Sequence, residues 1–324
     1  MSVKFERSVL ITGGTTGLGY HCALAIARKC PNYQVIIASR SDLNASAESI
    51  NQSLNQDNVK FLPLDLSSLA NVRAFAEDWK RNQFAPIQSL VFNAALQLPG
   101  EIEYTGDGFE KTFAVSHIGH ALLFSLLQPC LADAARVVIT SSGTHDPAQK
   151  TGLPDAKYTT AEDLAHPPAL AAREKGRKRY SSAKLANTLY MYALHGRFTS
   201  VNEKTGKNWT VTSMDPGLMP GTGLARGASK VEMFLWLRVL PHIIPLLRLL
   251  LTPNIHLPSE SGAALARLAV GADVEGVSGV YYEGLKEIRS SEDSYDQAKQ
   301  EDLWKWTLET VACNERERLA FSMD

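Results

Sequence analysis

The sequence predicts an α/β protein with a single-domain Rossmann fold, built on a doubly wound sheet of seven parallel strands. Short runs rich in Val, Ile and Leu alternate along the chain with longer stretches of helical period, which is the pattern of repeated βαβ units. The first strand-like run is followed at once by a glycine-rich turn. Small and polar residues close the later runs, at the edge where such sheets bind their ligands.

The seven strands and their helices can be placed from these patterns. Strands are expected near residues 9–12, 34–38, 59–62, 90–92, 136–140, 210–214 and 280–282. Helices are expected near residues 18–29, 42–55, 69–82, 108–127, 181–198, 261–270 and 297–313. No repeat, low-complexity tract or linker divides the chain, so residues 1–324 are expected to form one domain.

Two insertions interrupt the alternation. Residues 144–179 are rich in Pro, Ala and charged residues, and residues 218–258 are apolar. Long loops in compact domains usually carry a function or move, and both insertions follow strand ends. We expect residues 218–258 to form a lid over an apolar substrate, with Met233 and Trp236 lining it. A pair of core helices is the alternative.

Composition indicates a globular protein and excludes some partners. With 44% hydrophobic residues over 324 positions, the chain can bury a substantial core. A net charge of −1 and a pI near 6.7 give no overall attraction to nucleic acid. The four cysteines form no CxxC pair, which indicates reduced thiols and a cytoplasmic location.

Neither a secretory signal nor a transmembrane span is expected. The N-terminal residues contain no apolar signal core. Residues 233–251 are apolar but are interrupted by two arginines, a histidine and two prolines, and charges at the bilayer centre are costly. A weak contact with a membrane surface stays open. His117 and His120 have no further ligand nearby, so we expect packing histidines and no metal site.

The first strand runs into the turn Thr12-Gly-Gly-Thr-Thr-Gly-Leu-Gly19 and then into a helix. Glycines let the backbone approach a pyrophosphate, and free N–H groups at the helix N-terminus meet its charge. A tight turn with nothing bound is the alternative. The residues expected to hold the dinucleotide here are Gly13, Thr15, Thr16, Gly17, Leu18 and Gly19.

The end of the second strand predicts which dinucleotide is bound. An acidic residue there would hold the adenosine ribose by its 2′-hydroxyl, whereas a nearby arginine accommodates a 2′-phosphate. This chain has Ser39 and Arg40, which leave room and positive charge for the phosphate. We therefore expect NADP(H) over NAD(H), unless Arg40 is an ordinary solvated residue.

The third and fourth strands end in residues suited to the same cofactor. Asp65, followed by Leu66, can place a carboxylate near the adenine, or it can cap the following helix. The fourth strand ends in Asn93, Ala94 and Ala95, whose small side chains permit close approach of the cofactor. Asn93 could instead do no more than satisfy backbone groups at the sheet edge.

Tyr180 and Lys184 form a pair that can transfer protons. Residues four apart share a helix face, and a lysine cation beside a phenol stabilises the phenolate and lowers its pKa from about 10. Alone, such a pair is more often a solvated helix face. Ser142 ends the fifth strand on the same edge, although a serine there can be simple turn chemistry. His145, shortly after it, is a candidate for lining the substrate pocket.

Together these residues resemble the short-chain dehydrogenase/reductase family. Six motifs occur here in that family's order: the glycine turn, Asp65, residues 93–95, Ser142, the Tyr180-x-x-x-Lys184 motif and a Pro-Gly pair. The resemblance implies a seven-stranded Rossmann fold, a nicotinamide cofactor and a catalytic serine, tyrosine and lysine. It also implies a wall beside the nicotinamide formed by Pro216, Gly217, Leu218 and Thr222, of which Leu218 would also meet the substrate.

Within the family, the chain looks most similar to the light-dependent protochlorophyllide reductase and retinol dehydrogenase-like branch. Supporting stretches are the His-x-Gly-His run at 117–120, the segment 180–187 and the segment 222–226. Two residues depart from the pattern. Ser116 stands where the family has a catalytic asparagine, and it could still hold a water beside the lysine. Leu218 stands where the pigment reductases have a cysteine, which argues against photochemical reduction.

The expected function is reversible hydride transfer between NADPH and a carbonyl or polarised double bond of a mostly apolar small molecule. Tyr180 would exchange the proton, Ser142 would orient the oxygen, and Lys184 would bind the ribose and lower the tyrosine pKa. Polyketide, terpenoid, steroid and retinoid carbonyls all fit this ketoreductase or alcohol dehydrogenase type, class EC 1.1.1. The basic run 173–179 could meet an anionic substrate group, although a solvated loop is the favoured reading.

Two other functions stay open. Ser116 in place of the asparagine is consistent with an NADP(H)-binding regulator or scaffold without redox turnover. The fold could also serve a cyclase or isomerase. The chain is expected to be a monomer or a homodimer.

Overall fold

The protein is described here from a computed structural model, which describes residues 5–222 and 233–323. An eight-stranded sheet in the order β3-β2-β1-β4-β5-β6-β7-β8 forms its centre. Strands β1 to β7 pair in parallel, and β8 pairs antiparallel with β7. The strands are Arg7–Thr12, Tyr33–Ser39, Val59–Pro63, Ile87–Phe92, Leu131–Thr140, Thr210–Asp215, Val280–Glu283 and Lys286–Ile288.

The seven predicted strands are present as β1 to β7, but the prediction of a seven-stranded, all-parallel sheet is wrong. The eighth strand, β8, has three residues and follows β7 through a two-residue turn. Gly284 opens this turn with φ +55°, a conformation that glycine adopts without strain. A strand this short has no periodic pattern, which is why it could not be read from the sequence.

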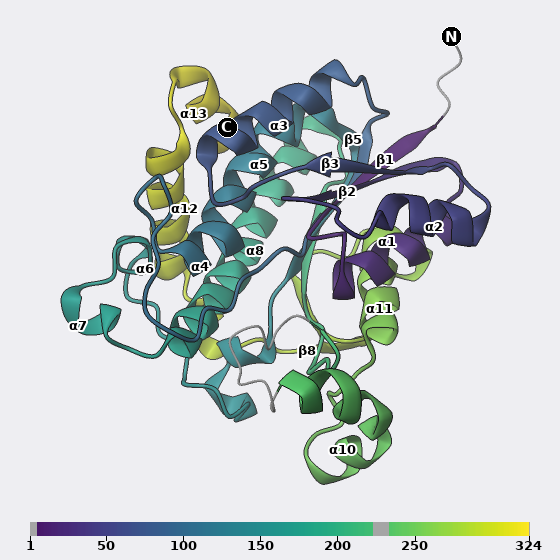
Figure 1. Cartoon of the computed structure of the whole chain (residues 1–324). Coiled ribbons are helices and arrows are strands. Elements are labelled where there is room, and N and C mark those ends of the chain that lie inside the picture. The colour runs from purple at the N-terminus through teal and green to yellow at the C-terminus, as the bar shows by residue number, and fades with distance from the viewer. Residues whose placement is uncertain (1–4, 223–232, 324) are drawn as a thin grey trace.

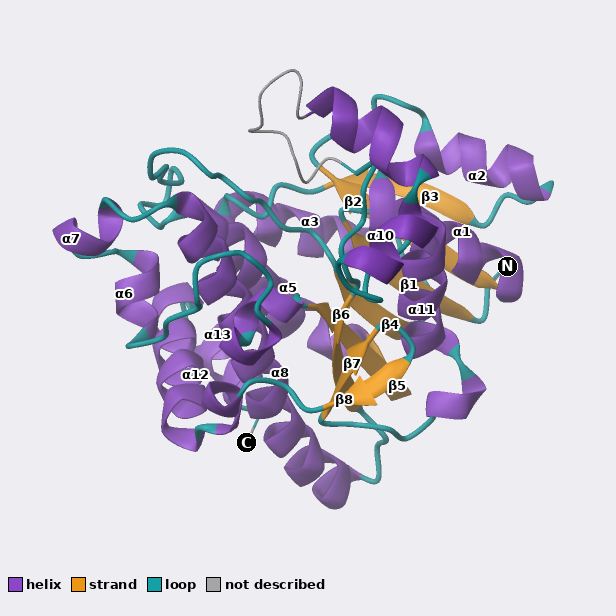
Figure 2. Cartoon of the chain, turned by 90° about the horizontal axis from the view of Figure 1, so that it is seen from below, coloured by secondary structure: helices purple, strands orange, loops and turns teal. Residues whose placement is uncertain are grey.

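Helices cover both faces of the twisted sheet (Figures 1 and 2). One layer contains α1 (Gly17–Lys29), α2 (Ser46–Leu54) and α11 (Pro258–Val270). The other contains α3 (Leu69–Arg81), α5 (Gly119–Leu127), α8 (Gly176–Thr205) and α12 (Gln297–Val311), with α13 (Glu315–Ser322) beside α5.

Side-chain alternation along the strands produces these two layers. In β1, Val9 and Ile11 join the core under α1 and α11, whereas Leu10 joins the core under α3, α5 and α8. Successive residues of a strand point to opposite faces, so a strand that is apolar throughout is buried on both sides. The predicted doubly wound organisation is therefore confirmed.

The segment predicted as one helix over 108–127 is divided. It consists of α4 (Lys111–Phe113), a π-helical turn (Ala114–Ile118) and α5, followed by a 3₁₀ turn (Gln128–Cys130). Residues 111–130 are long and apolar enough to cross a membrane, yet 78% of the most apolar window is buried inside the protein. This segment is the core helix against which α3 and α8 pack.

The first insertion, residues 144–179, is folded against the body of the protein. It contains two short helices, α6 (Ala161–Ala165) and α7 (Ala169–Ala172). The carboxylate of Asp302 in α12 accepts hydrogen bonds from the Tyr158 hydroxyl (2.6 Å) and the Ala161 N–H (2.8 Å). At its end Arg179, part of the basic run, is buried beside Glu110 at 3.5 Å, so this residue is structural.

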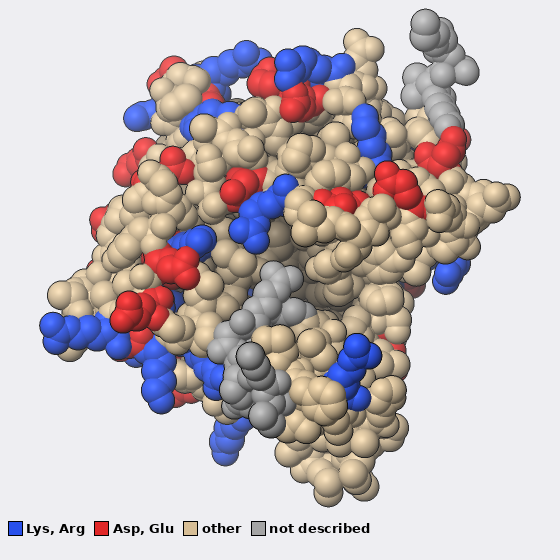
Figure 3. Space-filling model, in the orientation of Figure 1, with Lys and Arg blue, Asp and Glu red and all other residues tan. Residues whose placement is uncertain are grey.

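The second insertion stands away from the sheet. Its described part contains a π-helical turn (Leu235–Val239), a 3₁₀ turn (Leu240–His242) and α10 (Ile244–Leu250). These elements form a lobe at the lower end of the molecule in Figure 1, and Figure 3 shows that its surface is mostly uncharged. Residues 223–232 of the predicted lid lie outside the described residues, and so does most of the 222–226 segment.

Candidate active site

The predicted site residues gather at the carboxyl ends of the parallel strands. Strand β1 leads into the glycine turn, β4 into Asn93, β5 into Ser142, and β6 into Asp215 and the Pro-Gly pair. Helix α8 brings Tyr180 and Lys184 to the same edge. This is where open α/β sheets bind their ligands.

The glycine turn fits the pyrophosphate of a dinucleotide. Gly13 and Gly17 have φ of +66° and +54°, a region that side chains other than glycine rarely adopt. A Cβ on Gly19 would lie 2.3 Å from the Gly13 carbonyl oxygen, so the helix start packs tightly on the turn. Thr16 is the N-cap of α1, its side chain makes no capping hydrogen bond, and the first turn contains no acid. Free N–H groups there suit an anion.

At the end of β2, the side chains leave an open cationic corner. The Thr15 hydroxyl donates to the Ser39 hydroxyl at 3.1 Å. Arg40 is exposed and has no ion pair among the described residues. Asp65 bonds the N–H and hydroxyl of Ser67 at 2.9 and 2.6 Å, and the N-cap of α3 is Ser68. Asp65 therefore closes a local turn and does not cap the helix, while Leu66 is buried behind it.

Asn93 ties the end of β4 to the glycine turn. Its amide nitrogen donates to the carbonyl oxygens of Thr12 (2.9 Å) and Gly13 (3.3 Å). The Thr12 hydroxyl accepts hydrogen bonds from the backbone N–H groups of Asn93 (2.9 Å) and Ala94 (3.0 Å). Asn93 therefore satisfies backbone groups at the sheet edge, and its expected contact with the cofactor stays a prediction. Ala95 is exposed on the same edge.

Tyr180 and Lys184 are both buried at the start of α8. The Lys184 ammonium donates to the Thr140 carbonyl oxygen at 2.8 Å and lies 5.6 Å from the centre of the Tyr180 ring. The amide of Asn187 donates to the same carbonyl at 3.3 Å. The pair is thus anchored to the end of β5, and it is not the solvated helix face that the sequence left open.

The pKa values of the pair differ from the expectation. Burial raises the pKa of Tyr180 above its usual range, the charge of Asp215 acts in the same direction, and a hydrogen bond with Ser142 opposes them. Burial also lowers the pKa of Lys184 to about 8, against the effect of Asp215. The expectation that the pKa of Tyr180 lies below its usual value is wrong, because desolvation of the phenolate is the largest effect.

Ser116 lies in the π-helical turn that packs against α8. Its hydroxyl is buried and has no hydrogen-bond partner among the described residues, which costs about 1–3 kcal/mol when nothing compensates. The Ser116 carbonyl accepts a hydrogen bond from His120 Nδ1 at 3.0 Å. Single π-helical turns occur often at functional sites, and an unpaired hydroxyl suits a bound water here.

His117 and His120 are packing residues, as expected. His120 bonds the Thr12 hydroxyl through Nε2 at 2.8 Å, and His117 bonds the Thr307 hydroxyl through Nε2 at 2.8 Å. Burial lowers the pKa of His117 to about 3 and that of His120 to about 4. Both rings are therefore neutral at physiological pH.

His145 does not line a pocket, and that prediction is wrong. Its ring is fully buried. Nδ1 lies 2.7 Å from the Ser142 carbonyl oxygen, and Nε2 accepts a hydrogen bond from the Ser291 N–H at 3.1 Å. Both nitrogens are used to tie the loop after β5 to the C-terminal segment. Proximity to a strand end locates a residue but does not fix the direction of its side chain.

The Pro-Gly pair leads from β6 to the second insertion. Gly217 has φ +75°, and the exposed Leu218 pairs with Ile255 in a parallel bridge. Thr222 lies beside Gly17 in the glycine turn, 3.8 Å from the place of a Cβ there. The Trp236 indole donates to the Thr222 carbonyl at 2.9 Å, so it anchors the second insertion to the segment after the Pro-Gly pair, while Met233 is half-buried.

Two residues near this wall, the acceptor Asp215 and the donor Asn254, were not predicted. Asp215 directly precedes the Pro-Gly pair and is buried, and Asn254 donates to its carboxylate at 2.7 Å. Asp215 could have been found by the same rule that located Ser142, because it too ends a parallel strand. Asn254 gave no such signal, since it lies 39 residues further along the chain.

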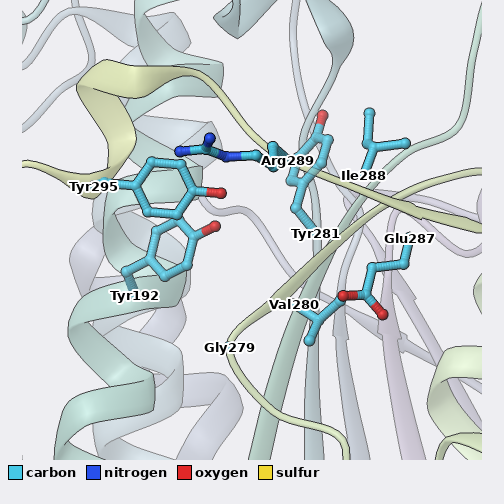
Figure 4. A pocket seen from close by; sticks show the side chains of 8 residues that line it. All are labelled: Tyr192, Gly279, Val280, Tyr281, Glu287, Ile288, Arg289 and Tyr295. Atoms are coloured by element: carbon cyan, nitrogen blue, oxygen red, sulfur yellow. The ribbon is translucent and has the colours of Figure 1, made fainter.

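A cavity of about 340 Å³ lies elsewhere, between α8 and the β7–β8 hairpin (Figure 4). Tyr192 and Tyr295 lie side by side in it, with Arg289 close to Tyr295. Tyr180 and Ser142 are not among its lining residues. The cavity is therefore not assigned to the reaction.

Comparison with known proteins agrees with the geometry of the site. The family model for short chain dehydrogenases matches residues 7–154. A chloroplastic protochlorophyllide reductase of Daucus carota is 32% identical over 321 residues, covering 93% of this chain and 77% of that protein. The chain belongs to the short-chain dehydrogenase/reductase family. A polyprenol dehydrogenase of Homo sapiens is 30% identical over 312 residues, covering 94% of this chain and 84% of that protein.

These two relatives confirm the predicted branch of the family, which includes protochlorophyllide reductases. Solved structures show the same fold. A 3-oxoacyl-[acyl-carrier protein] reductase from Brucella melitensis in complex with NAD has a TM-score of 0.60 at 20% identity, covering 86% of this chain and 97% of that chain. A short chain dehydrogenase from Shigella flexneri complexed with NADP has a TM-score of 0.58 at 17% identity, with the same coverage. The chain is an oxidoreductase of this family.

Proposed function

We propose that this short-chain dehydrogenase is an NADP(H)-dependent oxidoreductase acting on a carbonyl or alcohol of a mostly apolar small molecule. The observation that carries the proposal is the buried pair of Tyr180 and Lys184 with the half-buried Ser142, at the same sheet edge as the glycine turn. A phenol, a hydroxyl and an ammonium at one sheet edge can bind a carbonyl oxygen and exchange its proton.

The residues at the sheet edge fit a nicotinamide dinucleotide. The turn from Gly13 to Gly19 and the open start of α1 would hold the pyrophosphate. Ser39 and Arg40 would meet the adenosine ribose and a 2′-phosphate, which supports NADP(H). When bound, such a cofactor supplies or accepts the hydride.

The chain's own residues would then handle the proton. In the reductive direction Tyr180 donates its phenolic proton to the substrate oxygen, which Ser142 orients by a hydrogen bond. A raised pKa keeps Tyr180 protonated at neutral pH, which suits an acid. Lys184 uses one N–H on the Thr140 carbonyl, so its other two remain for the ribose. The buried Ser116 hydroxyl would hold a water that returns the proton.

The apolar substrate class is supported by the second insertion. Its exposed side chains are mostly large and apolar: Leu218, Phe234, Leu235, Leu237, Leu246, Leu249, Leu250, Leu251 and Leu257. A surface of this kind marks a binding site for an apolar ligand or partner. Among the relatives, a polyprenol dehydrogenase is named for a long apolar alcohol, which supports an alcohol or carbonyl of the EC 1.1.1 type.

The test is Tyr180→Phe. We expect NADPH binding to stay within about threefold of the wild type while turnover falls at least about 10²-fold, the usual scale for loss of a general acid. Binding is measured by NADPH fluorescence, and turnover by NADPH oxidation with a panel of apolar ketones, aldehydes and enones. Tyr190→Phe is the matched control, because Tyr190 lies on the same helix and its buried hydroxyl has no hydrogen-bond partner among the described residues. Near-normal turnover of Tyr180→Phe would contradict the proposal.

A further inference from the structure

Asp215 is a buried carboxylate at the end of β6, only 4% exposed. Its Oδ1 accepts the N–H of Gly217 at 3.0 Å, and its Oδ2 accepts the amide of Asn254 at 2.7 Å. Burying a carboxylate is costly unless hydrogen bonds compensate. These two bonds fix the position of the charge and, with it, the turn that carries Pro216 and Gly217.

The hydrogen-bond chain continues from Asn254 to α10. Asn254 Oδ1 lies 3.1 Å from His256 Nε2, and His256 Nδ1 lies 3.3 Å from Arg248 Nη2. Because a guanidinium only donates, His256 Nδ1 must accept and Nε2 must carry the proton for Asn254. Arg248 is itself held by Glu260 at 2.6 Å. Each link from Arg248 of α10 to Asp215 therefore joins one donor to one acceptor.

Two residues of this hydrogen-bond chain, Asn254 and His256, pack directly against Gly217. A Cβ there would lie 2.4 Å from Asn254 Oδ1 and 2.7 Å from His256 Cδ2. The backbone of Leu218 donates to the Asn254 carbonyl and accepts from the His256 N–H, both at 2.9 Å. The predicted nicotinamide wall is thus held by Asp215 from one side and by residues 254–256 from the other.

Asp215 also faces the proton-transfer pair. Its Oδ2 is 2.9 Å from the place of a Cβ on Gly143, the residue after Ser142. Its negative charge acts on both Tyr180 and Lys184. The other titratable groups packed around these residues are His120 of α5, His145 after β5, Tyr281 and Glu283 of β7, and His256 before α11.

We propose that Asp215 is a positioning residue of the reaction: its carboxylate locks the Gly217 wall to Asn254 and places a fixed negative charge beside Lys184 and Tyr180. The inference rests on the proposed oxidoreductase function, because it assigns the wall and the acid to one reaction. The same hydrogen bonds connect α10 of the proposed lid to the turn beside which the nicotinamide would lie.

The first test is Asp215→Asn, which keeps the shape but leaves one side-chain oxygen for two donors, the Gly217 N–H and the Asn254 amide. We expect the KM for NADPH to rise about tenfold, in line with loss of a hydrogen bond to a charged group. Removal of the negative charge lowers the pKa of Tyr180 and of Lys184. Reduction needs the protonated tyrosine, so the basic limb of the kcat/KM profile moves to lower pH, by roughly one unit.

The second test is the double variant Asp215→Asn/Asn254→Asp, which exchanges the carboxylate and the amide. A donor and an acceptor again face each other, and His256 Nε2 still has an oxygen to bond. We expect the KM for NADPH to return to within about twofold of the wild type, because hydrogen bonds set this constant. The basic limb stays displaced, because residue 215, whose charge acts on Tyr180, is then neutral.

Glu283→Gln is the control for removing a carboxylate at this edge of the sheet. Glu283 is the register partner of Asp215 on β7 but makes no hydrogen bond to the wall in the described structure, so KM and pH profile should match the wild type. Thermal unfolding of each variant identifies any loss of fold. A wild-type KM and basic limb in Asp215→Asn, or a double variant whose KM stays raised, would overturn the inference. A wild type without NADPH oxidation would instead refute the proposed function.

Discussion

A single side chain, Arg40, carries the proposed preference for NADP(H). It is exposed at the end of β2, and Thr15 and Ser39 bond each other beside it. We expect Arg40→Ala to raise the KM for NADPH about tenfold or more, since a charge-assisted bond to phosphate contributes about 1.5–3 kcal/mol. The KM for NADH should change little. Steady-state kinetics with both cofactors measures the difference.

Arg28→Ala is the control for Arg40→Ala. Arg28 is also an exposed arginine, but it lies in the last turn of α1, at the end away from the glycine turn. It should leave both KM values unchanged. If Arg40→Ala weakened NADPH and NADH equally, the arginine would act on the shared part of the cofactor, and the preference for the 2′-phosphate would be lost as an explanation.

Some site residues could be predicted singly and others could not. Ser142, Tyr180 and Lys184 were found because strand ends and helix spacing place them at one edge. Asp215 was not predicted, although it too ends a parallel strand. The pKa of Tyr180 was predicted in the wrong direction, because spacing shows the neighbouring lysine but not how completely the phenol is buried.

At the scale of elements, Trp236 joins the second insertion, the proposed lid, to the segment after the Pro-Gly pair. Its indole donates to the Thr222 carbonyl at 2.9 Å, and its own carbonyl accepts the Gly221 N–H at 2.9 Å. Trp236→Phe removes the first bond, worth about 0.5–1.5 kcal/mol. We expect the KM for an apolar substrate to rise several-fold while the KM for NADPH stays near the wild-type value.

Trp306→Phe is the matched control for the lid. It also removes an indole hydrogen bond, to Glu162 at 2.7 Å, but on α12, far along the chain from the lid. Both constants should be unchanged there. Equal effects of the two tryptophan changes would show that the lid has no special role in substrate binding.

Element boundaries were predictable where periodicity is long and strong, as for α1, α3 and α12. The helix expected over 108–127 was not, because its residues are apolar all round and give no sign of the π-helical turn at Ala114–Ile118. Helix α13 was missed because its charged sequence carries only one fully buried apolar residue, Phe321. In each case tertiary packing decides the structure and local pattern does not.

At the scale of the whole molecule, two buried histidines join the layers around the sheet. His120 of α5 bonds Thr12 at the end of β1, and His117 bonds Thr307 of α12. Since Thr307 donates its own proton to the Leu303 carbonyl at 2.6 Å, His117 Nε2 must be the donor. Burial of both rings disfavours their charged forms and keeps them neutral in the folded protein.

Their neutrality in the folded protein makes stability depend on pH. The unfolded chain protonates each histidine near its ordinary pKa of 6.5, whereas burial lowers the folded pKa of His117 to about 3 and of His120 to about 4. Between pH 6.5 and about 4 the unfolded state binds more protons, so stability is present above pH 6.5 and falls as the pH decreases. The loss is about 1.4 kcal/mol per pH unit for each histidine.

His117→Gln keeps a donor for Thr307 but cannot be protonated. On going from pH 7 to pH 5, we expect its free energy of unfolding to fall by about 2 kcal/mol less than that of the wild type. Urea unfolding at the two pH values measures the difference, and comparison within each protein removes any constant effect of the substitution. His242→Gln changes an exposed histidine on the lid and should keep the wild-type pH dependence. If His117→Gln kept it as well, the His117 ring would be protonated in the folded protein, and the neutral, donating ring assigned here would be wrong.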